Sequence, residues 1–185
     1  ALSHGHLDHV GGIDALVTKT GKAGIPLVLH PAAFRNPRYL KVTEDFKVMF
    51  PAFTREKAEA AGAVVVDADA PYPMLDHAAV FLGRIPRATG FEKGAPNLCC
   101  EIDGREQPDP FDDDSAMVFH IKGKGLVVLS GCAHSGIVNT VAYARQVTGI
   151  DEVEAIMGGF HLSGQDADAV IRPTVDALKA FEPTY

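Results

Sequence analysis

The densest chemical motif of this chain lies close to its start, where three histidines and one aspartate fall within six residues. The segment reads His-Gly-His-Leu-Asp-His and begins at His4. His4 and His6 are two residues apart, a spacing that points both side chains to one face of an extended segment. We expect Asp8 to extend this alternation and His9 to begin the turn into the next helix. Four ligands packed into six residues cannot all bind one tetrahedral ion comfortably. The run therefore predicts two adjacent cations, one bound by His4 and His6 and the other by Asp8 and His9.

The chemistry of these donors limits the choice of metal. Imidazole and carboxylate together suit zinc, manganese or iron rather than calcium, and zinc is the ion that we favour. The alternative is a polar surface turn in which histidines gather by chance, but four ligand-type residues at this spacing argue against it.

Two later histidines occupy matching positions in the sequence. His134 stands four residues after the apolar run 126–130, and His161 stands four residues after the run 153–157. Both have glycines beside them. Open α/β folds place their ligand groups at the carboxyl ends of strands, so the repeated arrangement predicts that His134 and His161 are further metal ligands.

The roles of three other residues stay open at this point. Cys132 is either a soft metal ligand or a small buried residue at a strand end. Asp114 either points into the site or caps a turn. His30 ends a predicted strand, just before a proline, where it could line a pocket.

Alternation of short apolar runs with helical stretches predicts an α/β layered fold. With 185 residues, of which 46% are hydrophobic and 22% charged, the chain is long enough for one well-buried core. We therefore expect a single domain over residues 1–185. Strands are expected near 26–30, 64–66, 79–82, 115–121, 126–130 and 153–157, and helices near 13–20, 55–61, 137–148 and 171–181. Residues 83–114 are expected to be mostly loop.

Composition narrows the choice of partner and compartment. The formal charge is −7, with 17 basic against 24 acidic residues and no basic cluster, which argues against a nucleic-acid or anionic-membrane partner. No apolar run approaches the roughly 18 residues that span a bilayer. Three cysteines, two of them adjacent, do not form a disulfide framework. We expect a cytoplasmic protein that binds a small molecule.

The predicted loop contains the basic residues that could bind such a molecule. Arg84, Arg87 and Lys93 lie within a stretch rich in glycine and proline, in an otherwise acidic chain. Arginine in such a loop suits a phosphate or carboxylate, so Arg84 and Arg87 are the predicted substrate-binding residues. The alternative is that they are solvated surface cations.

Taken together, the opening histidine run, the glycines after it and the histidines at later strand ends resemble the metallo-β-lactamase superfamily. Within it, the chain looks most like the subgroup named for 7,8-dihydropterin-6-yl-methyl-4-(β-D-ribofuranosyl)aminobenzene 5′-phosphate synthase. The segments that carry this narrower match are 3–12, 83–87, 113–114, 131–140 and 158–162.

The resemblance implies an αββα sandwich with the metals at the edge where two sheets meet. In the superfamily several strands precede the histidine run, and members of the subgroup carry a His-Cys-Thr-Gly block after the last helix. Neither feature occurs within these 185 residues. We therefore expect the chain to be part of a longer protein that also supplies the N-terminal strands and the C-terminal end.

The function expected from these residues is metal-dependent hydrolysis. Two cations about 3.5–4 Å apart lower the pKa of a shared water to around 7, and the resulting hydroxide attacks a carbonyl or phosphorus centre. Asp8 and His9 are the predicted catalytic residues, Asp8 because it could also orient or deprotonate this water. The substrate is expected to be small and either phosphorylated or an ester.

Three alternatives remain. The subgroup name implies a transferase in pterin-cofactor biosynthesis. A di-iron redox module would favour a carboxylate where His6 stands, so the sequence argues mildly against it. A non-catalytic, metal-stabilised binding domain is the third.

Overall fold

The computed structural model describes residues 1–22, 24–163 and 167–185, and the chain divides into two compact units. Unit 1 comprises Ala1–Asp69 and Ala95–Asp113, and unit 2 comprises Ala70–Gly94 and Asp114–Tyr185. The single domain expected over residues 1–185 stays a prediction. The α/β class is confirmed, because the chain contains both β-sheets and α-helices.

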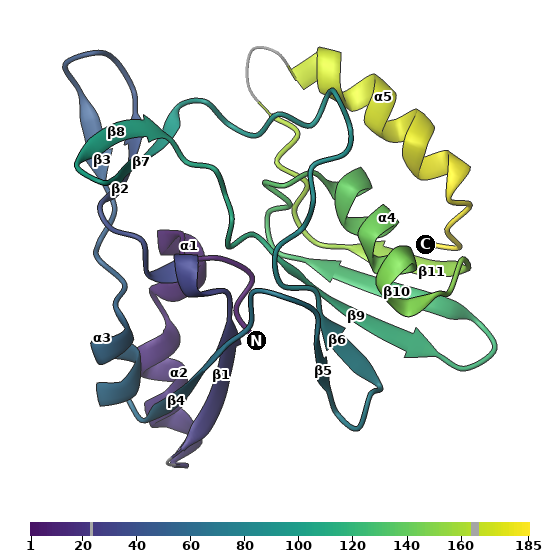
Figure 1. Cartoon of the computed structure of the whole chain (residues 1–185), viewed down its shortest axis with the longest axis horizontal. Coiled ribbons are helices and arrows are strands. Elements are labelled where there is room, and N and C mark those ends of the chain that lie inside the picture. Colours follow the sequence, from purple (N-terminus) through teal and green to yellow (C-terminus); the bar gives the residue numbers. More distant parts are fainter. Residues whose placement is uncertain (23, 164–166) are drawn as a thin grey trace. The chain divides into compact units, whose positions relative to one another are not determined.

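Unit 1 begins with the histidine motif and a parallel pair of strands. The strands are β1 (Ile25–Leu29) and β4 (Ala63–Asp67), and the helices around them are α1 (Leu7–Val10), α2 (Ile13–Thr20) and α3 (Arg55–Ala60). Helix α2 is amphipathic, since Ile13 and Val17 are buried four residues apart while Asp14 and Lys19 are exposed. The buried pair joins Leu29 of β1 and Ala58 of α3 in one apolar core; Figure 1 shows the helices α2 and α3 beside the strands β1 and β4.

A second, antiparallel sheet of unit 1 has the strand order β3-β2-β7-β8. Its strands are β2 (Arg38–Lys41), β3 (Lys47–Met49), β7 (Leu98–Ile102) and β8 (Arg105–Pro108), and the 3-10 helix η1 (Pro31–Phe34) precedes them. The prediction that 83–114 is mostly loop is confirmed, but it did not include the strands β7 and β8. Both strands are short, and β8 is polar and exposed along its whole length, so no apolar run marks it in the sequence.

Unit 2 is a five-stranded sheet covered by two helices (Figure 1). In the order β11-β10-β9-β6-β5, the strands are Val153–Met157, Gly125–Ser130, Ala116–Ile121, Ala79–Phe81 and Tyr72–Met74. The helices are α4 (Ile137–Thr148) and α5 (Ala167–Ala180). Ile137 and Val141 of α4 pack with Val118, Leu126 and Val128 of the sheet in a buried apolar cluster.

The pairing of β10 with β11 decides where the later histidines lie. These two neighbours are parallel, while the other strand pairs of this sheet are antiparallel. Parallel strands end at the same edge of a sheet, so the loops that follow Ser130 and Met157 begin side by side. The structure confirms the strands predicted at 126–130 and 153–157 and the helix predicted at 137–148.

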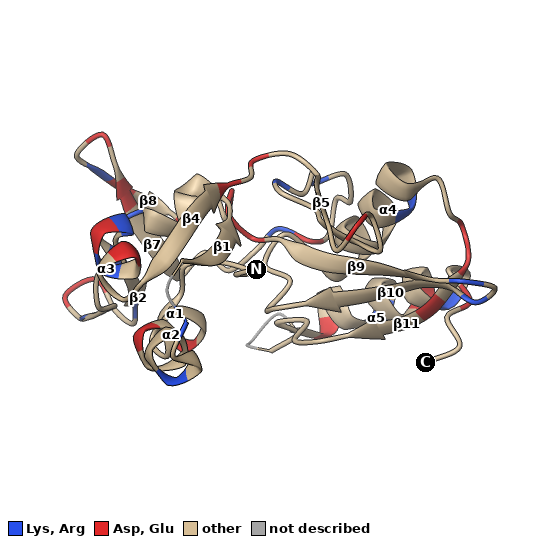
Figure 2. Cartoon of the chain, turned by 90° about the horizontal axis from the view of Figure 1, so that it is seen from below, with Lys and Arg blue, Asp and Glu red and all other residues tan. Residues whose placement is uncertain are grey.

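Charge and apolar surface are distributed unevenly over the elements. In Figure 2, helix α3 carries both acidic and basic side chains, whereas the strands β9 and β10 are almost entirely uncharged. Among the described residues, no helix is both long and apolar enough to cross a membrane.

Candidate metal centre

The histidine motif of unit 1 gathers its side chains as the spacing predicts. The ring centroids of His4 and His6 are 4.6 Å apart, and those of His4 and His9 are 4.2 Å apart. His4 and His6 are buried, whereas Asp8 is exposed. One potential ligand atom from each of His4, His6 and Asp8 lies within 4.8 Å of the other two, so these three residues could hold a metal ion.

The backbone of the motif differs from the expected extended run. Helix α1 spans Leu7–Val10, so Asp8 lies in a helical turn and does not continue the alternation of His4 and His6. A turn of helix carries adjacent side chains around its axis. The Asp8 carboxylate accordingly lies 3.2 Å from Nε2 of His9 and is also close to the first two histidines.

Ser3 contacts two histidines of the motif, a role that the sequence does not predict. Its Oγ lies 3.2 Å from Nδ1 of His4 and 3.2 Å from Nδ1 of His9. A hydrogen-bonded ring nitrogen leaves the opposite nitrogen of the imidazole as the ligand atom, and the hydrogen bond fixes the ring orientation. Ser3 therefore ties together two of the predicted metal ligands.

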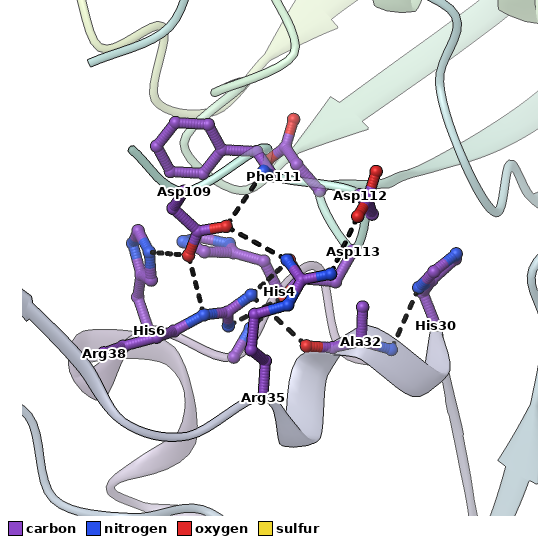
Figure 3. Close-up of polar contacts among 12 residues, drawn as sticks. His4, His6, His30, Ala32, Arg35, Arg38, Asp109, Phe111, Asp112 and Asp113 are labelled. Atoms are coloured by element: carbon purple, nitrogen blue, oxygen red, sulfur yellow. Dashed lines mark hydrogen bonds and ion pairs between the residues drawn. The ribbon is translucent and has the colours of Figure 1, made fainter. Parts of the chain in front are cut away.

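Beneath the motif lies a buried group of charges, the Arg38 network, drawn in Figure 3. Its members are Arg35, Arg38, Asp109, Asp112 and Asp113. Arg38 is 2% exposed and binds two carboxylates, with Nε 2.7 Å from Asp109 and Nη2 2.6 Å from Asp113. Arg35 adds contacts of 3.2 Å to Asp109 and 2.8 Å to Asp112.

The Arg38 network holds the motif through its backbone and through one ring. Asp113 accepts a hydrogen bond of 2.8 Å from the backbone N–H of Gly5, the residue between the first two histidines. Nε2 of His6 lies 3.8 Å from Asp109. A Cβ added to Gly5 would come within 2.0 Å of the carbonyl oxygen of Ala33. Only glycine therefore allows the motif to lie this close to the network.

Two members of the network, Asp109 and Arg38, have pKa values that differ from their usual ones. Burial by itself would raise the pKa of Asp109, but contacts with His6, Arg38, the backbone N–H of Phe111 and Arg35 hold that pKa at about 2. Burial would likewise lower the pKa of Arg38, yet Asp113 and Asp109 raise it above its usual value. Both residues are therefore ionised, and each compensates the buried charge of the other.

His30 lies near the motif (Figure 3), and its side chain caps the 3-10 helix η1. Its Nδ1 accepts a hydrogen bond of 3.1 Å from the N–H of Ala32 and so caps η1 (Figure 3). An imidazole nitrogen that accepts a hydrogen bond carries no proton, so in the neutral ring the proton is on Nε2. This capping role accounts for the burial of His30 next to Pro31.

Unit 2 brings the two later histidines together at the edge where β10 and β11 end. The ring centroids of His134 and His161 are 4.5 Å apart. His134 is buried and His161 is exposed. Gly158 and Gly159 allow the two loops to approach, because added Cβ atoms would lie 2.2 Å from Ser130 O and 2.8 Å from Gly131 O.

Asp114 supports the loop that carries His134. It is buried just before β9 begins, and its Oδ2 accepts a hydrogen bond of 2.8 Å from the backbone N–H of Ser135. The sequence left open whether Asp114 points into the site or caps a turn, and this hydrogen bond corresponds to the second role. Cys132 lies half-buried in the same loop, and both of its possible roles remain.

The long segment that contains the two predicted substrate-binding arginines also lies against this loop. Arg84 and Arg87 are exposed. Arg87 donates hydrogen bonds to the carbonyl oxygens of His134, at 3.0 Å, and of Glu92, at 3.2 Å. The buried Glu92 carboxylate accepts hydrogen bonds of 2.9 Å from the N–H groups of Val138 and Asn139 at the start of α4.

Unit 1 therefore offers a donor set that could hold a metal ion, formed by His4, His6 and Asp8. Unit 1 contributes three imidazoles and one carboxylate, and unit 2 contributes two imidazoles. Zinc, manganese and iron bind such mixtures of nitrogen and oxygen. Several supporting residues, Ser3, Arg38, Glu92, Asp109 and Asn139, were not found from the sequence.

The chain is similar to one protein family and to several known proteins. A family model described as the metallo-beta-lactamase superfamily matches residues 1–146. The chain is 30% identical to 7,8-dihydropterin-6-methyl-4-(beta-D-ribofuranosyl)-aminobenzene-5'-phosphate synthase of Methanocaldococcus jannaschii, over 96% of the chain and 60% of the relative. A second protein of that organism, described as uncharacterized, is 29% identical over 97% of the chain and 63% of its own length.

A solved structure shows the same fold. It is described as a metal-dependent hydrolase of the beta-lactamase superfamily and matches with a TM-score of 0.77 at 23% identity. The match covers 97% of the chain and 63% of that protein. The chain thus spans less than two thirds of each of these three proteins.

Proposed function

Because the chain belongs to the metallo-beta-lactamase superfamily, we propose that it is the metal-binding part of an enzyme that hydrolyses a small, phosphorylated or ester-type molecule. The observation that supports this most is the gathering of His4, His6 and Asp8, whose ligand atoms lie within 4.8 Å of one another. The buried Arg38 network fixes this group from below, which is what a precise metal site requires.

The proposed ligands are the six residues predicted from the sequence: His4, His6, Asp8, His9, His134 and His161. Two divalent cations, zinc by preference, are the proposed cofactors. When bound, such cations lower the pKa of a shared water and stabilise negative charge on the substrate. Support comes from each unit separately, through the short distances among its own histidines.

Asp8 and His9 are proposed to handle the proton in this reaction. The Asp8 carboxylate is exposed and lies 3.2 Å from Nε2 of His9. An exposed carboxylate in this position can orient the attacking water and accept its proton, while Nε2 of His9, opposite the nitrogen that contacts Ser3, is the atom proposed to bind the metal. His9 is in turn held by Ser3.

A transferase is the second candidate, and one observation favours it. The relative that is 30% identical over nearly the whole chain is named as a synthase whose product carries a 5′-phosphate. The same ligands would then stabilise charge during transfer to an acceptor other than water. Arg84, exposed on the segment 83–94, remains the proposed contact for a phosphate in either reaction.

The test is made on the protein that carries this chain. Its metal content is measured by elemental analysis, and turnover of phosphomonoesters, phosphodiesters and lactones is followed with and without a chelator. We expect at least one metal ion per chain and a chelator-sensitive release of product. Incorporation of ¹⁸O from labelled water into the product supports hydrolysis, whereas an unlabelled adduct with a second substrate supports transfer.

Single substitutions test the ligands. H4A, H6A and H134A are each expected to reduce metal content and turnover together. Less than one equivalent of metal in the parent protein, with no chelator-sensitive turnover, would overturn the proposal. The cytoplasmic location and the absence of nucleic-acid and membrane partners stay predictions from composition.

A further inference from the structure

The loop that carries His134 depends on side chains from elsewhere in unit 2 for its shape. It runs from the end of β10 at Ser130 to the start of α4 at Ile137. Ala133 has a φ angle of 52° and Gly136 one of 98°, so the backbone turns through left-handed conformations on both sides of the histidine. Such a loop has no strand or helix ladder to hold it, and its position must come from other contacts.

Arg87 contacts the backbone of the histidine itself. Its Nη2 donates a hydrogen bond of 3.0 Å to the carbonyl oxygen of His134, and its Nη1 donates one of 3.2 Å to the carbonyl oxygen of Glu92. The planar guanidinium thus bridges the carbonyl groups of Glu92 and His134, which are 42 positions apart in the sequence. We propose that Arg87 is a positioning residue that sets the place of the His134 imidazole for metal binding.

The segment that carries Arg87 is itself firmly attached to the far side of the same loop. The backbone N–H groups of Ala88 and Thr89 donate hydrogen bonds to Oδ1 of Asn139, both at 2.9 Å. Glu92, 6% exposed, accepts hydrogen bonds from the N–H groups of Val138 and Asn139, and Thr89 Oγ1 donates to its carboxylate. Arg87 therefore acts from a rigid base.

The peptide after His134 is held independently of Arg87. Ser135 donates its N–H to Asp114 at 2.8 Å, and its carbonyl oxygen accepts a hydrogen bond of 2.8 Å from Nδ2 of Asn139. Arg87 completes this set at the carbonyl of His134 itself. Loss of the guanidinium should accordingly shift the histidine backbone while leaving the rest of the loop attached.

This role differs from the binding of a substrate anion, the role expected from the sequence. A residue that binds an anionic substrate changes the KM and leaves the metal affinity of the substrate-free protein unchanged. A residue that positions a metal ligand changes the metal affinity even without substrate, by about 10–100-fold where the support of a ligand is lost. The inference rests on the proposed function, because it takes His134 to be a ligand.

The experiment compares R87Q and R87K with the unchanged protein and with K93Q as the matched control. Lys93 is exposed in the same segment, so K93Q removes one positive charge nearby without removing the Arg87 bridge. Zinc affinity is measured by competition with a chromophoric chelator, and the cobalt-substituted proteins are compared by their visible absorption. H134A provides the reference for a lost ligand.

We expect R87Q to bind zinc about 10-fold or more weakly and to shift the cobalt spectrum, with R87K in between because one amine cannot bridge both carbonyls. K93Q should match the unchanged protein. Unchanged affinity and spectrum in R87Q, together with a raised KM, would overturn the inference and return Arg87 to substrate binding. If H134A also binds both metal equivalents normally, His134 is not a ligand and the proposed function fails instead.

Circular dichroism shows whether each variant is folded. If R87Q does not fold, the zinc affinity and cobalt spectrum of R87K test the inference.

Discussion

The two units hold their histidines by different physical means. In unit 1 the proposed ligands come from one short motif, and the buried charges of the Arg38 network fix it. In unit 2 the proposed ligands come from two loops, and hydrogen bonds between backbone and side chains fix the loop of His134. A single charged residue therefore matters greatly in unit 1, whereas the support in unit 2 is spread over several contacts.

The difference follows from the cost of burying charge. A buried ion that loses its partner cannot recover its hydration, and the penalty is about 3–5 kcal/mol. A neutral or backbone hydrogen bond contributes about 0.5–1.5 kcal/mol net. The comparison predicts large effects from single changes in the Arg38 network and smaller ones around His134.

The largest effect is expected for R38M. Arg38 compensates Asp109 and Asp113, which are 5% and 1% exposed, so the substitution leaves two buried carboxylates without their main partner. We expect a loss of about 3–5 kcal/mol in the free energy of unfolding, measured by urea denaturation. R55M is the control, because Arg55 pairs with Asp67 at the surface of the same unit, where the loss should be about 0–1 kcal/mol. Equal losses would contradict the comparison.

The second prediction concerns the packing of Glu92 in unit 2. A Cβ on Gly136 would lie 2.2 Å from Cδ of Glu92, and the residue has a φ angle of 98°. G136A should therefore cost about 1–3 kcal/mol of stability and also weaken zinc binding, since it displaces the base from which Arg87 acts. G149A isolates the backbone effect, because Gly149 has a φ angle of 69° with open space around it. Its cost should be about 1 kcal/mol, with no change in zinc affinity.

The third prediction compares one histidine from each unit in the metal-free protein. His4 is 1% exposed and packs against two other rings, whereas His161 is exposed. Removing the buried ring should cost about 1–2 kcal/mol of unfolding free energy, and removing the exposed one about 0.5 kcal/mol or less. Thermal unfolding of H4A and H161A after dialysis against a chelator gives the two values. A larger loss in H161A would show that the loop in unit 2 is the less tolerant region.

In both units the sequence predicts the histidines but not the residues that support them. The histidine motif and the strand-end histidines were predictable because each depends on a local pattern of ligand residues, apolar runs and glycines. The supporting residues were not, because their contacts join distant positions. Arg38 and Asp113 are separated by 75 residues, and Glu92 and Val138 by 46. A lone buried charge has no local signature in a sequence.

The same limit applies to the fold. Strands β10 and β11 are apolar and were predicted, but β8 consists of exposed polar residues and was missed. Its pairing with β7 comes from the backbone. Arg87 illustrates the point for the site: its charge suggested an anion, while the structure shows it bonded to two carbonyl groups.

The smallest effect, a difference in reaction rate, is expected among the cysteines. Burial raises the pKa of the Cys100 thiol to about 11 and also raises that of Cys99, so almost no thiolate forms in unit 1 at pH 8. Cys132, half-buried in unit 2, should react first with iodoacetamide, because the thiolate is the reactive form. Peptide mass mapping at short reaction times identifies the labelled site. If zinc protects Cys132, it is a ligand; equal labelling with and without zinc makes it a structural residue of the loop, and faster labelling of Cys99 or Cys100 would contradict the burial of unit 1.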